Sequence, residues 1–197
     1  TITTERKMKK FHDLKEAIQS AKNDGLLDMK DDILTGFSGE TMVGALQRFS
    51  KLMSDENSVY LEVGVYQGLT LLSVAKANRN ITAIGIDNFA FFDKEGINHG
   101  IVKDRMSKLD ITNAQIINKD YEDALENLEQ ELNGKKVGVY FIDGPHDYRS
   151  QLMCLQLIKP HLSPNAVIII DDSNYRHVRQ ANRDFLKTNP EFKLLFQ

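Results

Sequence analysis

Hydrophobic residues change their spacing once along the chain. In residues 5–23 and 40–53 the apolar positions recur every three or four residues, which is typical of amphipathic helices. From residue 58 onward, short runs rich in valine and isoleucine alternate with helical patterns of about 10–15 residues. We therefore predict an N-terminal helical extension over residues 1–57, followed by an α/β domain over residues 58–197.

The apolar runs of the second region predict the strands of a parallel sheet. We expect strands at 59–63, 81–86, 114–117, 137–142, 166–170 and 192–196, and helices at 68–78, 101–109, 121–132, 147–159 and 175–187. Such alternation builds βαβ units, and continuously apolar strands indicate that helices cover both faces of the sheet. The predicted fold class is α/β, a Rossmann-like, doubly wound and mostly parallel sheet.

Acidic residues follow or end the five core strands of this predicted sheet. They are Glu62, Asp87, Asp120, Asp143 and Asp171. In doubly wound sheets, ligands bind beyond the carboxyl ends of the strands, where the strand order reverses. We therefore expect the functional site at this edge of the sheet.

A glycine-containing turn, residues 62–68, joins the first core strand to a helix. Gly64 permits a tight turn and close approach of a ligand, and the following helix offers free N–H groups to an anionic group. Asp87, at the end of the next strand, can accept both hydroxyls of a ribose. Together they predict a nucleoside-containing cofactor. Tyr66 and Leu69 stand where the G-x-G-x-x-G pattern requires glycine, which disfavours a nicotinamide-dependent oxidoreductase.

Composition limits the classes of binding partner and the cellular compartment that we expect for this protein. The 197 residues carry a net charge of −3 and one cysteine, Cys154. This balance argues against a generally basic nucleic-acid-binding protein, and one cysteine cannot form an intrachain disulfide. The longest aliphatic run is far shorter than the roughly 20 residues of a membrane span, and nothing resembles a signal peptide. We expect a soluble, cytoplasmic protein with neither nucleic acid nor a membrane as partner.

Three segments resemble the class I S-adenosylmethionine-dependent methyltransferases, and among them the metal-dependent O-methyltransferases of the catechol and macrocin type. Residues 61–68 resemble the cofactor turn, residues 141–146 resemble the F-I-D-G-x-H segment, and residues 162–172 resemble the fifth strand with its two terminal aspartates. The resemblance covers about residues 59–172. It implies the class I methyltransferase fold, with S-adenosylmethionine as cofactor.

The resemblance also implies roles for individual positions. The cofactor-binding residues would be Glu62, Gly64, Tyr66, Gly68, Asp87, Asp120, Tyr121 and Asp143. Gly64 and Gly68 would line the methionine part, and Asp87 would hold the ribose. Asp120 and Tyr121 would meet the adenine.

Asp143, Asp171 and Asp172 match the metal-binding acids of the metal-dependent members. In this fold the two strands that they follow are neighbours, so three carboxylates would converge and repel one another. A hard cation resolves that conflict, and all-oxygen ligands suit Mg²⁺, Mn²⁺ or Ca²⁺, of which we expect Mg²⁺. The alternative is that Asp171 and Asp172 cap the next helix.

His146 follows Asp143 by three residues, at an offset where catechol-type enzymes carry a lysine base. We interpret Asp143 and His146 as the catalytic residues. A hydroxyl bound to a cation loses its proton more readily, and histidine titrates near neutral pH, as a general base requires. The alternative is a histidine that bonds only its own loop.

The predicted function is metal-assisted O-methylation of a small hydroxylated metabolite, such as a catechol or a vicinal diol. The alternative is a non-catalytic Rossmann-like protein that binds the cofactor or a nucleoside. Class I methyltransferases normally add a seventh, antiparallel strand, which does not follow the predicted sixth strand here. Either the domain is truncated before its last strand, or the open edge of the sheet is the surface of a homodimer.

Overall fold

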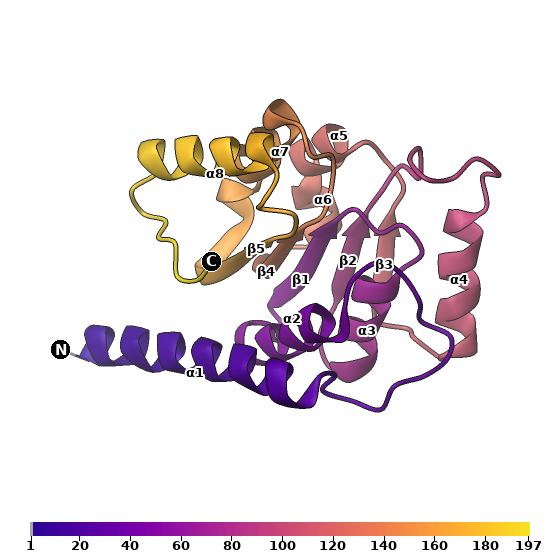
Figure 1. Ribbon diagram of the computed structural model, residues 1–197, viewed down its shortest axis with the longest axis horizontal. Coiled ribbons are helices and arrows are strands. Elements are labelled where there is room, and N and C mark those ends of the chain that lie inside the picture. The colour runs from indigo at the N-terminus through magenta and orange to yellow at the C-terminus, as the bar shows by residue number, and fades with distance from the viewer. Residues whose placement is uncertain (1) are drawn as a thin grey trace.

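Five parallel strands form the centre of the computed structural model, which describes residues 2–197, with side chains from Met8 onward. The strands are β1 (Ser58–Val63), β2 (Ala83–Ile86), β3 (Ala114–Ile117), β4 (Lys136–Ile142) and β5 (Leu162–Ile170). Their spatial order is β3-β2-β1-β4-β5, so the order reverses between β1 and β4 (Figure 1). This confirms the predicted Rossmann-like sheet, with its switch point at the carboxyl ends of β1 and β4.

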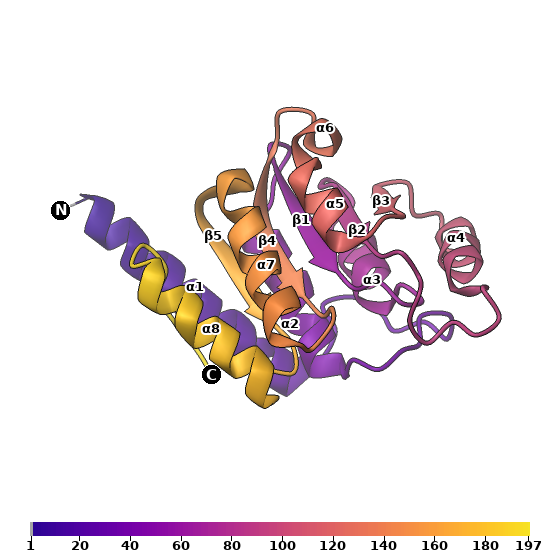
Figure 2. The ribbon, with the colours of Figure 1, turned by 90° about the horizontal axis from the view of Figure 1, so that it is seen from above.

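Helices cover both faces of the sheet, as Figures 1 and 2 show. One hydrophobic cluster packs the first four against one face: α1 (Ile2–Asp24), α2 (Glu40–Met53), α3 (Leu69–Ala77) and α4 (Asn98–Lys108). A second cluster packs the others against the opposite face: α5 (Tyr121–Glu126), α6 (Leu128–Leu132), α7 (Tyr148–Ile158) and α8 (Arg176–Thr188). A short 3₁₀ turn, η1 (Lys159–His161), leads into β5. None of the helices within residues 2–197 is both long and apolar enough to cross a membrane.

Burial on both faces explains why the strands are continuous apolar runs. Along β1, Tyr60 belongs to the cluster under α1–α4, whereas Leu61 and Val63 belong to the cluster under α5–α8. Successive side chains of a strand point to opposite faces, so both sets of positions must be apolar when both faces are covered. The same pattern made the core strands recognisable in the sequence.

The predicted N-terminal helices at 5–23 and 40–53 are present as α1 and α2. The α2 side chains Leu46 and Phe49 are buried in the cluster that α3 and the sheet share. Residues 25–39 connect the two helices without forming a helix or strand of their own. The division into an extension and a domain at residue 57 stays a prediction.

The predicted single helix over 121–132 is wrong, because the structure has two short helices with Asn127 between them. The Asn127 amide donates to the carbonyl oxygen of Asp123 at 2.9 Å. Asparagine side chains compete with backbone groups in this way, which favours a break in the helix. The break leaves the buried Leu125 and Leu128 on the same side of the sheet.

The predicted strand at 192–196 is also wrong, because these residues form no strand. Their aromatic rings pack on helices instead. Phe192 lies 5.0 Å from the ring of Phe185 on α8, and Phe196 stacks on Phe11 of α1 at 5.4 Å. Within the described residues β5 is therefore the outer strand of the sheet, and the homodimer predicted to cover that edge stays a prediction.

Candidate functional site

Backbone hydrogen bonds extend the sheet to the acidic residues at the strand ends. The Asp143 N–H donates to the carbonyl oxygen of Val63 at 2.9 Å, and the Asp171 N–H donates to that of Ile142 at 3.0 Å. The ladder therefore fixes Asp143 between β1 and β5, with Asp171 beside it. The backbone thus brings Asp143 and Asp171 to adjacent positions at the tips of β4 and β5.

The turn after β1 passes directly over the end of β4. Gly64 has φ +93°, and a Cβ at this position would lie 2.0 Å from the carbonyl oxygen of Asp143. Only glycine fits such a close approach in this backbone conformation. Gly68, with φ +87°, precedes the first residue of α3, so the free N–H groups of that helix open onto the same edge.

Asp87 holds the glycine turn in place. Its Oδ2 accepts from the N–H groups of Val65 and Tyr66 at 2.9 and 2.8 Å, and its Oδ1 accepts from that of Phe89 at 2.7 Å. A carboxylate offers about four acceptor positions, so this arrangement leaves one for a ligand hydroxyl. Acceptance of both ribose hydroxyls, as expected from the sequence, would require one of these bonds to open.

Glu62 is completely buried, and its carboxyl group contacts other protein groups. The hydroxyls of Tyr60 and Thr70 bond to it at 3.0 and 2.9 Å. Burial raises the pKa of Glu62 to about 8, against the opposing effect of these two hydroxyls, and the negative charges of Asp143 and Asp87 add to the rise. Glu62 therefore ties β1 to the first turn of α3 and supports the glycine turn from beneath.

Asp120 and Tyr121 lie beyond the end of β3, and both have protein partners. The Asp120 carboxylate caps α5 by accepting from the N–H of Glu122 at 3.0 Å. The Tyr121 hydroxyl donates to Ser150 Oγ of α7 at 3.0 Å. Their predicted contact with adenine stays a prediction.

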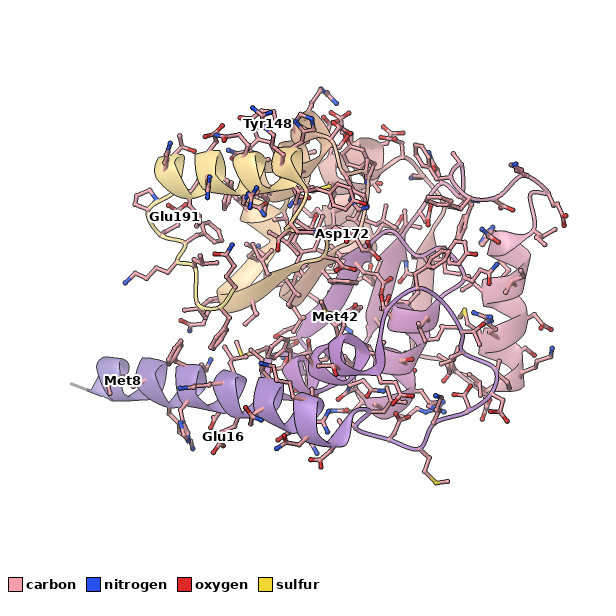
Figure 3. The ribbon with its side chains drawn as sticks, viewed as in Figure 1. Met8, Glu16, Met42, Tyr148, Asp172 and Glu191 are labelled. Carbon is pink, nitrogen blue, oxygen red and sulfur yellow. The ribbon has the colours of Figure 1, made fainter. Side chains whose placement is uncertain are left out.

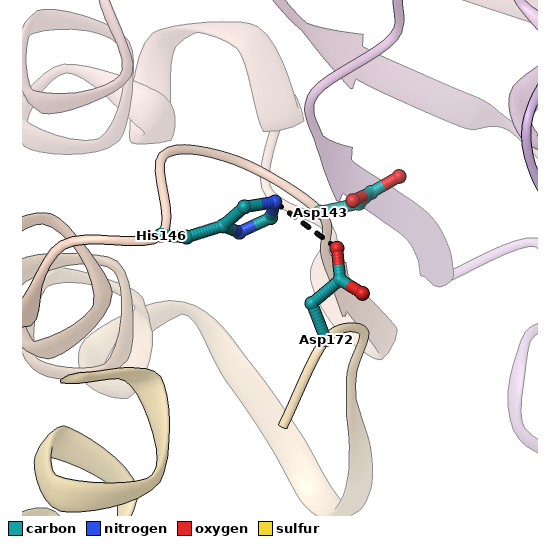
Figure 4. Close-up of side chains that lie close together, drawn as sticks. All are labelled: Asp143, His146 and Asp172. Atoms are coloured by element: carbon teal, nitrogen blue, oxygen red, sulfur yellow. Dashed lines mark ion pairs between the residues drawn. The ribbon is translucent and has the colours of Figure 1, made fainter. Parts of the chain in front are cut away.

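Two carboxylates and one imidazole converge beside the glycine turn, just beyond the ends of β4 and β5. Asp143, His146 and Asp172 each offer one ligand atom, and the three atoms lie within 4.8 Å of one another (Figure 4). His146 Nε2 lies 3.0 Å from Asp172 Oδ2, and the ring of Tyr175 stacks on the imidazole at 5.0 Å. Figure 3 places Asp172 between the strand tips and α8, far from Met8 on α1.

Asp171 is adjacent to this cluster and adds to its negative charge. Burial raises the pKa of Asp143 to about 7, and the charges of Asp171 and then Asp172 contribute to the rise. The Asp171 Oδ1 accepts from the N–H of Asp172 at 2.9 Å, so one of its oxygens is already bonded locally. Two of the three predicted metal ligands therefore meet, and His146 takes the third place in the group.

His146 was predicted as a general base and not as a ligand. The spacing in the sequence could have indicated a ligand role. His146 follows Asp143 by three residues, and a tight turn of that length brings the imidazole back to the Asp143 carboxylate. The alternative role for the aspartates, a cap on the next helix, is wrong. Tyr175 is the N-cap of α8, and none of the side chains from Met8 onward caps that helix.

Comparison with known proteins identifies the family. The family described as "Methyltransferase domain" matches residues 61–173, from the glycine turn to just past Asp172. Similar solved structures include an O-methyltransferase from Bacillus cereus in complex with SAH, at 16% identity and a TM-score of 0.62, covering 91% of this chain and 88% of that one. The O-methyltransferase TomG from Streptomyces achromogenes, in complex with SAM, is 16% identical with a TM-score of 0.59, and the match covers 91% of this chain and 78% of that one. CalS11, a TDP-rhamnose 3'-O-methyltransferase, is 14% identical with a TM-score of 0.61, and the match covers 88% of this chain and 83% of that one.

At these identities the solved structures confirm the predicted fold alone, while the family match covers more than half of the 197 residues. The chain belongs to the methyltransferase-domain family, and the enzyme class predicted from its sequence, a class I S-adenosylmethionine-dependent methyltransferase, is confirmed.

Proposed function

We propose that this methyltransferase transfers the methyl group to a hydroxyl of a small metabolite and that a divalent cation assists the reaction. The group of Asp143, His146 and Asp172 beside the glycine turn carries this proposal. Two similar proteins support it, since the Bacillus cereus structure is that of an O-methyltransferase and CalS11 acts on TDP-rhamnose.

The residues of the cluster fit a cation. Three aspartates surround the tips of β4 and β5, and burial and mutual repulsion already disfavour the charge on Asp143. Asp143 and Asp172 would supply oxygen ligands and His146 a nitrogen ligand, with Asp171 adding negative charge beside them. This mixed donor set suits Mn²⁺ and other transition metals as well as the predicted Mg²⁺.

When bound, S-adenosylmethionine supplies an electrophilic methyl group, and a divalent cation lowers the pKa of an acceptor hydroxyl. The chain supplies alignment and a place for the proton. We call Asp143, His146 and Asp172, together with the adjacent Asp171, the acid cluster. Gly64 lets the glycine turn lie against Asp143, so that this turn and the acid cluster adjoin. The imidazole of His146 cannot ligate the cation and form an imidazolium at once, so the two roles are alternatives. As the general base, His146 would accept the proton of the hydroxyl, and Asp172, at 3.0 Å, would stabilise the resulting imidazolium.

Methyl transfer to catechol, measured as SAH formation by mass spectrometry with Mg²⁺ or Mn²⁺, tests the proposal. Asp143→Asn should lower turnover by at least about a hundredfold, because metal assistance is worth several kcal/mol. Its affinity for SAH, measured by calorimetry, should stay within a few-fold of the wild type.

Full turnover in excess chelator, or in the Asp143→Asn variant, would refute the role of the cation. Tight binding of SAH without transfer to any hydroxylated acceptor would instead favour the non-catalytic alternative. Lack of SAH binding would contradict both.

A further inference from the structure

Three aromatic rings from distant parts of the chain meet at the rim of the site. Phe37, between α1 and α2, stacks on Tyr66 of the glycine turn at 5.0 Å, and it lies 6.4 Å from Phe92 in the segment after β2. We call these three residues the aromatic cluster. Phe37 is 82% exposed and Phe92 is 83% exposed. Large apolar side chains that gather in contact with water mark an interaction site.

A buried arginine of α4 joins two of the three segments. The Arg105 guanidinium donates to the Thr35 carbonyl at 3.0 Å, to the Thr35 hydroxyl at 2.8 Å and to the Gln67 carbonyl at 2.8 Å. Thr35 precedes Phe37 by two residues, and Gln67 directly follows Tyr66. The guanidinium therefore fixes the backbone on both sides of the Phe37–Tyr66 stack.

A buried asparagine of the same helix joins the third segment. Asn98 accepts from the Gln67 side-chain amide at 3.0 Å, and its own amide donates to the Phe92 carbonyl at 3.2 Å. Asn98 and Arg105 are seven residues apart and so lie on one side of α4. Both bond to Gln67, one to its side chain and one to its backbone. One helix thus holds all three members of the aromatic cluster.

Further contacts immobilise the segment that carries Phe37. Lys76 of α3 pairs with Asp28 and Asp31, and the buried Gln47 of α2 bonds to Asp28 and to the Leu27 N–H. A segment without secondary structure, held at this many points, is ordered before any ligand arrives. Such pre-organisation lowers the entropic cost of binding and is typical of functional loops.

We propose that the aromatic cluster binds the flat, apolar part of the methyl acceptor and that the preferred acceptor is therefore an aromatic hydroxyl compound. The inference rests on the proposed function. The cluster and the acid cluster flank the same turn, because Tyr66 and Gly64 both belong to it and Gly64 adjoins Asp143. The three members carry no charge, and their ring faces suit another ring. Asn98 and Arg105 act as positioning residues.

A single-tryptophan variant tests which group occupies the cluster. The chain has no tryptophan, so Phe37→Trp gives a unique fluorophore within it. With SAH saturating, catechol should change the emission of the introduced indole saturably. In contrast, cis-1,2-cyclohexanediol, which has the vicinal hydroxyls without the aromatic ring, should bind roughly three- to tenfold more weakly.

Each other occupant gives a different result, and each of these results overturns the inference. If SAH alone changes the emission and catechol then adds no further change, the cluster belongs to adenine. Emission that depends on protein concentration would assign it to a second copy of the chain. Absence of any saturable change with catechol, up to its solubility, would show that no aromatic acceptor binds there.

Neighbouring phenylalanines give a matched pair of variants. Phe92→Leu should weaken catechol binding roughly three- to tenfold. Phe91→Leu should change it less than about twofold, because Phe91 is 68% exposed but does not stack on Phe37 or Tyr66. SAH affinity should be unchanged in both. Equal effects of the two variants would refute a specific role for the cluster.

Arg105→Lys tests the positioning role, because lysine keeps the charge but loses the planar fork that reaches Thr35 and Gln67. In the Phe37→Trp background it should make the introduced indole more accessible to acrylamide. In the wild-type background it should raise KM for catechol and leave kcat within about twofold. Unchanged acrylamide quenching would refute the positioning role.

The two proposals fail in different ways. If catechol changes the emission of the Phe37→Trp variant but neither catechol nor cis-1,2-cyclohexanediol is methylated, the proposed function fails and the aromatic site remains. If catechol is methylated while that emission stays constant, the aromatic site fails and the proposed function remains.

Discussion

The two halves of the carboxyl edge differ in how their charges are satisfied. On the β1–β3 half, Asp87 accepts three backbone hydrogen bonds and Glu62 is bonded by two hydroxyls. On the β4–β5 half, three aspartates gather, and within the described residues their one ion pair is that of Asp172 with His146. On the first half, protein groups already bond both carboxyl groups and leave one acceptor position on Asp87, whereas the second half holds excess negative charge. The comparison indicates that binding of a cation is concentrated on the β4–β5 half.

Gly64→Ala should give the largest effect, because the two halves touch at this residue. The new Cβ would lie 2.0 Å from the Asp143 carbonyl oxygen, at φ +93°. We expect a loss of about 3 kcal/mol in unfolding free energy, measured in urea, and at least about a hundredfold weaker SAH binding.

Gly96→Ala is the matched control. Gly96 also has a positive φ, +67°, but a Cβ there meets no atom within 4 Å. Its effect should be about 1 kcal/mol, from the backbone conformation alone. An equal loss in both variants would show that contact between the two halves does not matter.

Single substitutions within the acid cluster should separate its members by their affinity for Mn²⁺, measured by calorimetry. Asp143→Asn and Asp172→Asn should each weaken binding at least about tenfold, as expected when a direct ligand is lost. Asp171→Asn should weaken it less, because one Asp171 oxygen already accepts the Asp172 N–H.

His146→Gln separates the two roles of the imidazole. A ligand role predicts about tenfold weaker Mn²⁺ binding together with lower turnover. A role as general base predicts unchanged Mn²⁺ affinity and turnover about a hundredfold lower. If Asp171→Asn proves the most damaging change of the four, the assignment of His146 to the cluster is wrong.

Glu62→Gln should give the smallest effect of these changes near pH 5, where Glu62 is protonated in the folded state, and it changes how stability depends on pH. With a folded pKa of about 8 against an ordinary value of 4.5, Glu62 keeps its proton in the folded state while the unfolded state loses it. Unfolding free energy should therefore fall as pH rises from about 5 to 8, by up to about 1 kcal/mol per pH unit for this group.

Urea unfolding at several pH values in this window tests the point. The Glu62→Gln variant should lose stability more slowly with rising pH than the wild type, and the remaining slope would come from Asp143, whose pKa is raised to about 7. Equal slopes in the two proteins would show that Glu62 is ionised in the folded state.

Local patterns in the sequence predicted the sheet and the acids at its edge. The core strands were recognisable because both faces are buried, and Asp143 and Asp171 followed from parallel strands ending together. The strand expected at 192–196 was wrong because an aromatic and aliphatic run also suits packing on helices. No local pattern distinguishes these two outcomes.

The positioning contacts of the aromatic cluster were not predictable from spacing. Arg105 meets Thr35 across 70 residues of sequence, and Gln67 meets Asn98 across 31. Such pairs depend on how α4 packs beside the sheet, which the periodicity of a single helix does not encode. Asp143 and Asp172 were foreseen because the sheet itself fixes their separation.

The stack between Phe11 and Phe196 affects the order in which the protein assembles during synthesis. Phe11 leaves the ribosome early and Phe196 much later in translation, so the outer part of α1 gains this partner only after the sheet has been made. A nascent chain stalled before Phe196 would leave the Phe11 ring without this partner, although Leu14, Ala17 and Ala21 of α1 could already be buried in the cluster beneath the sheet.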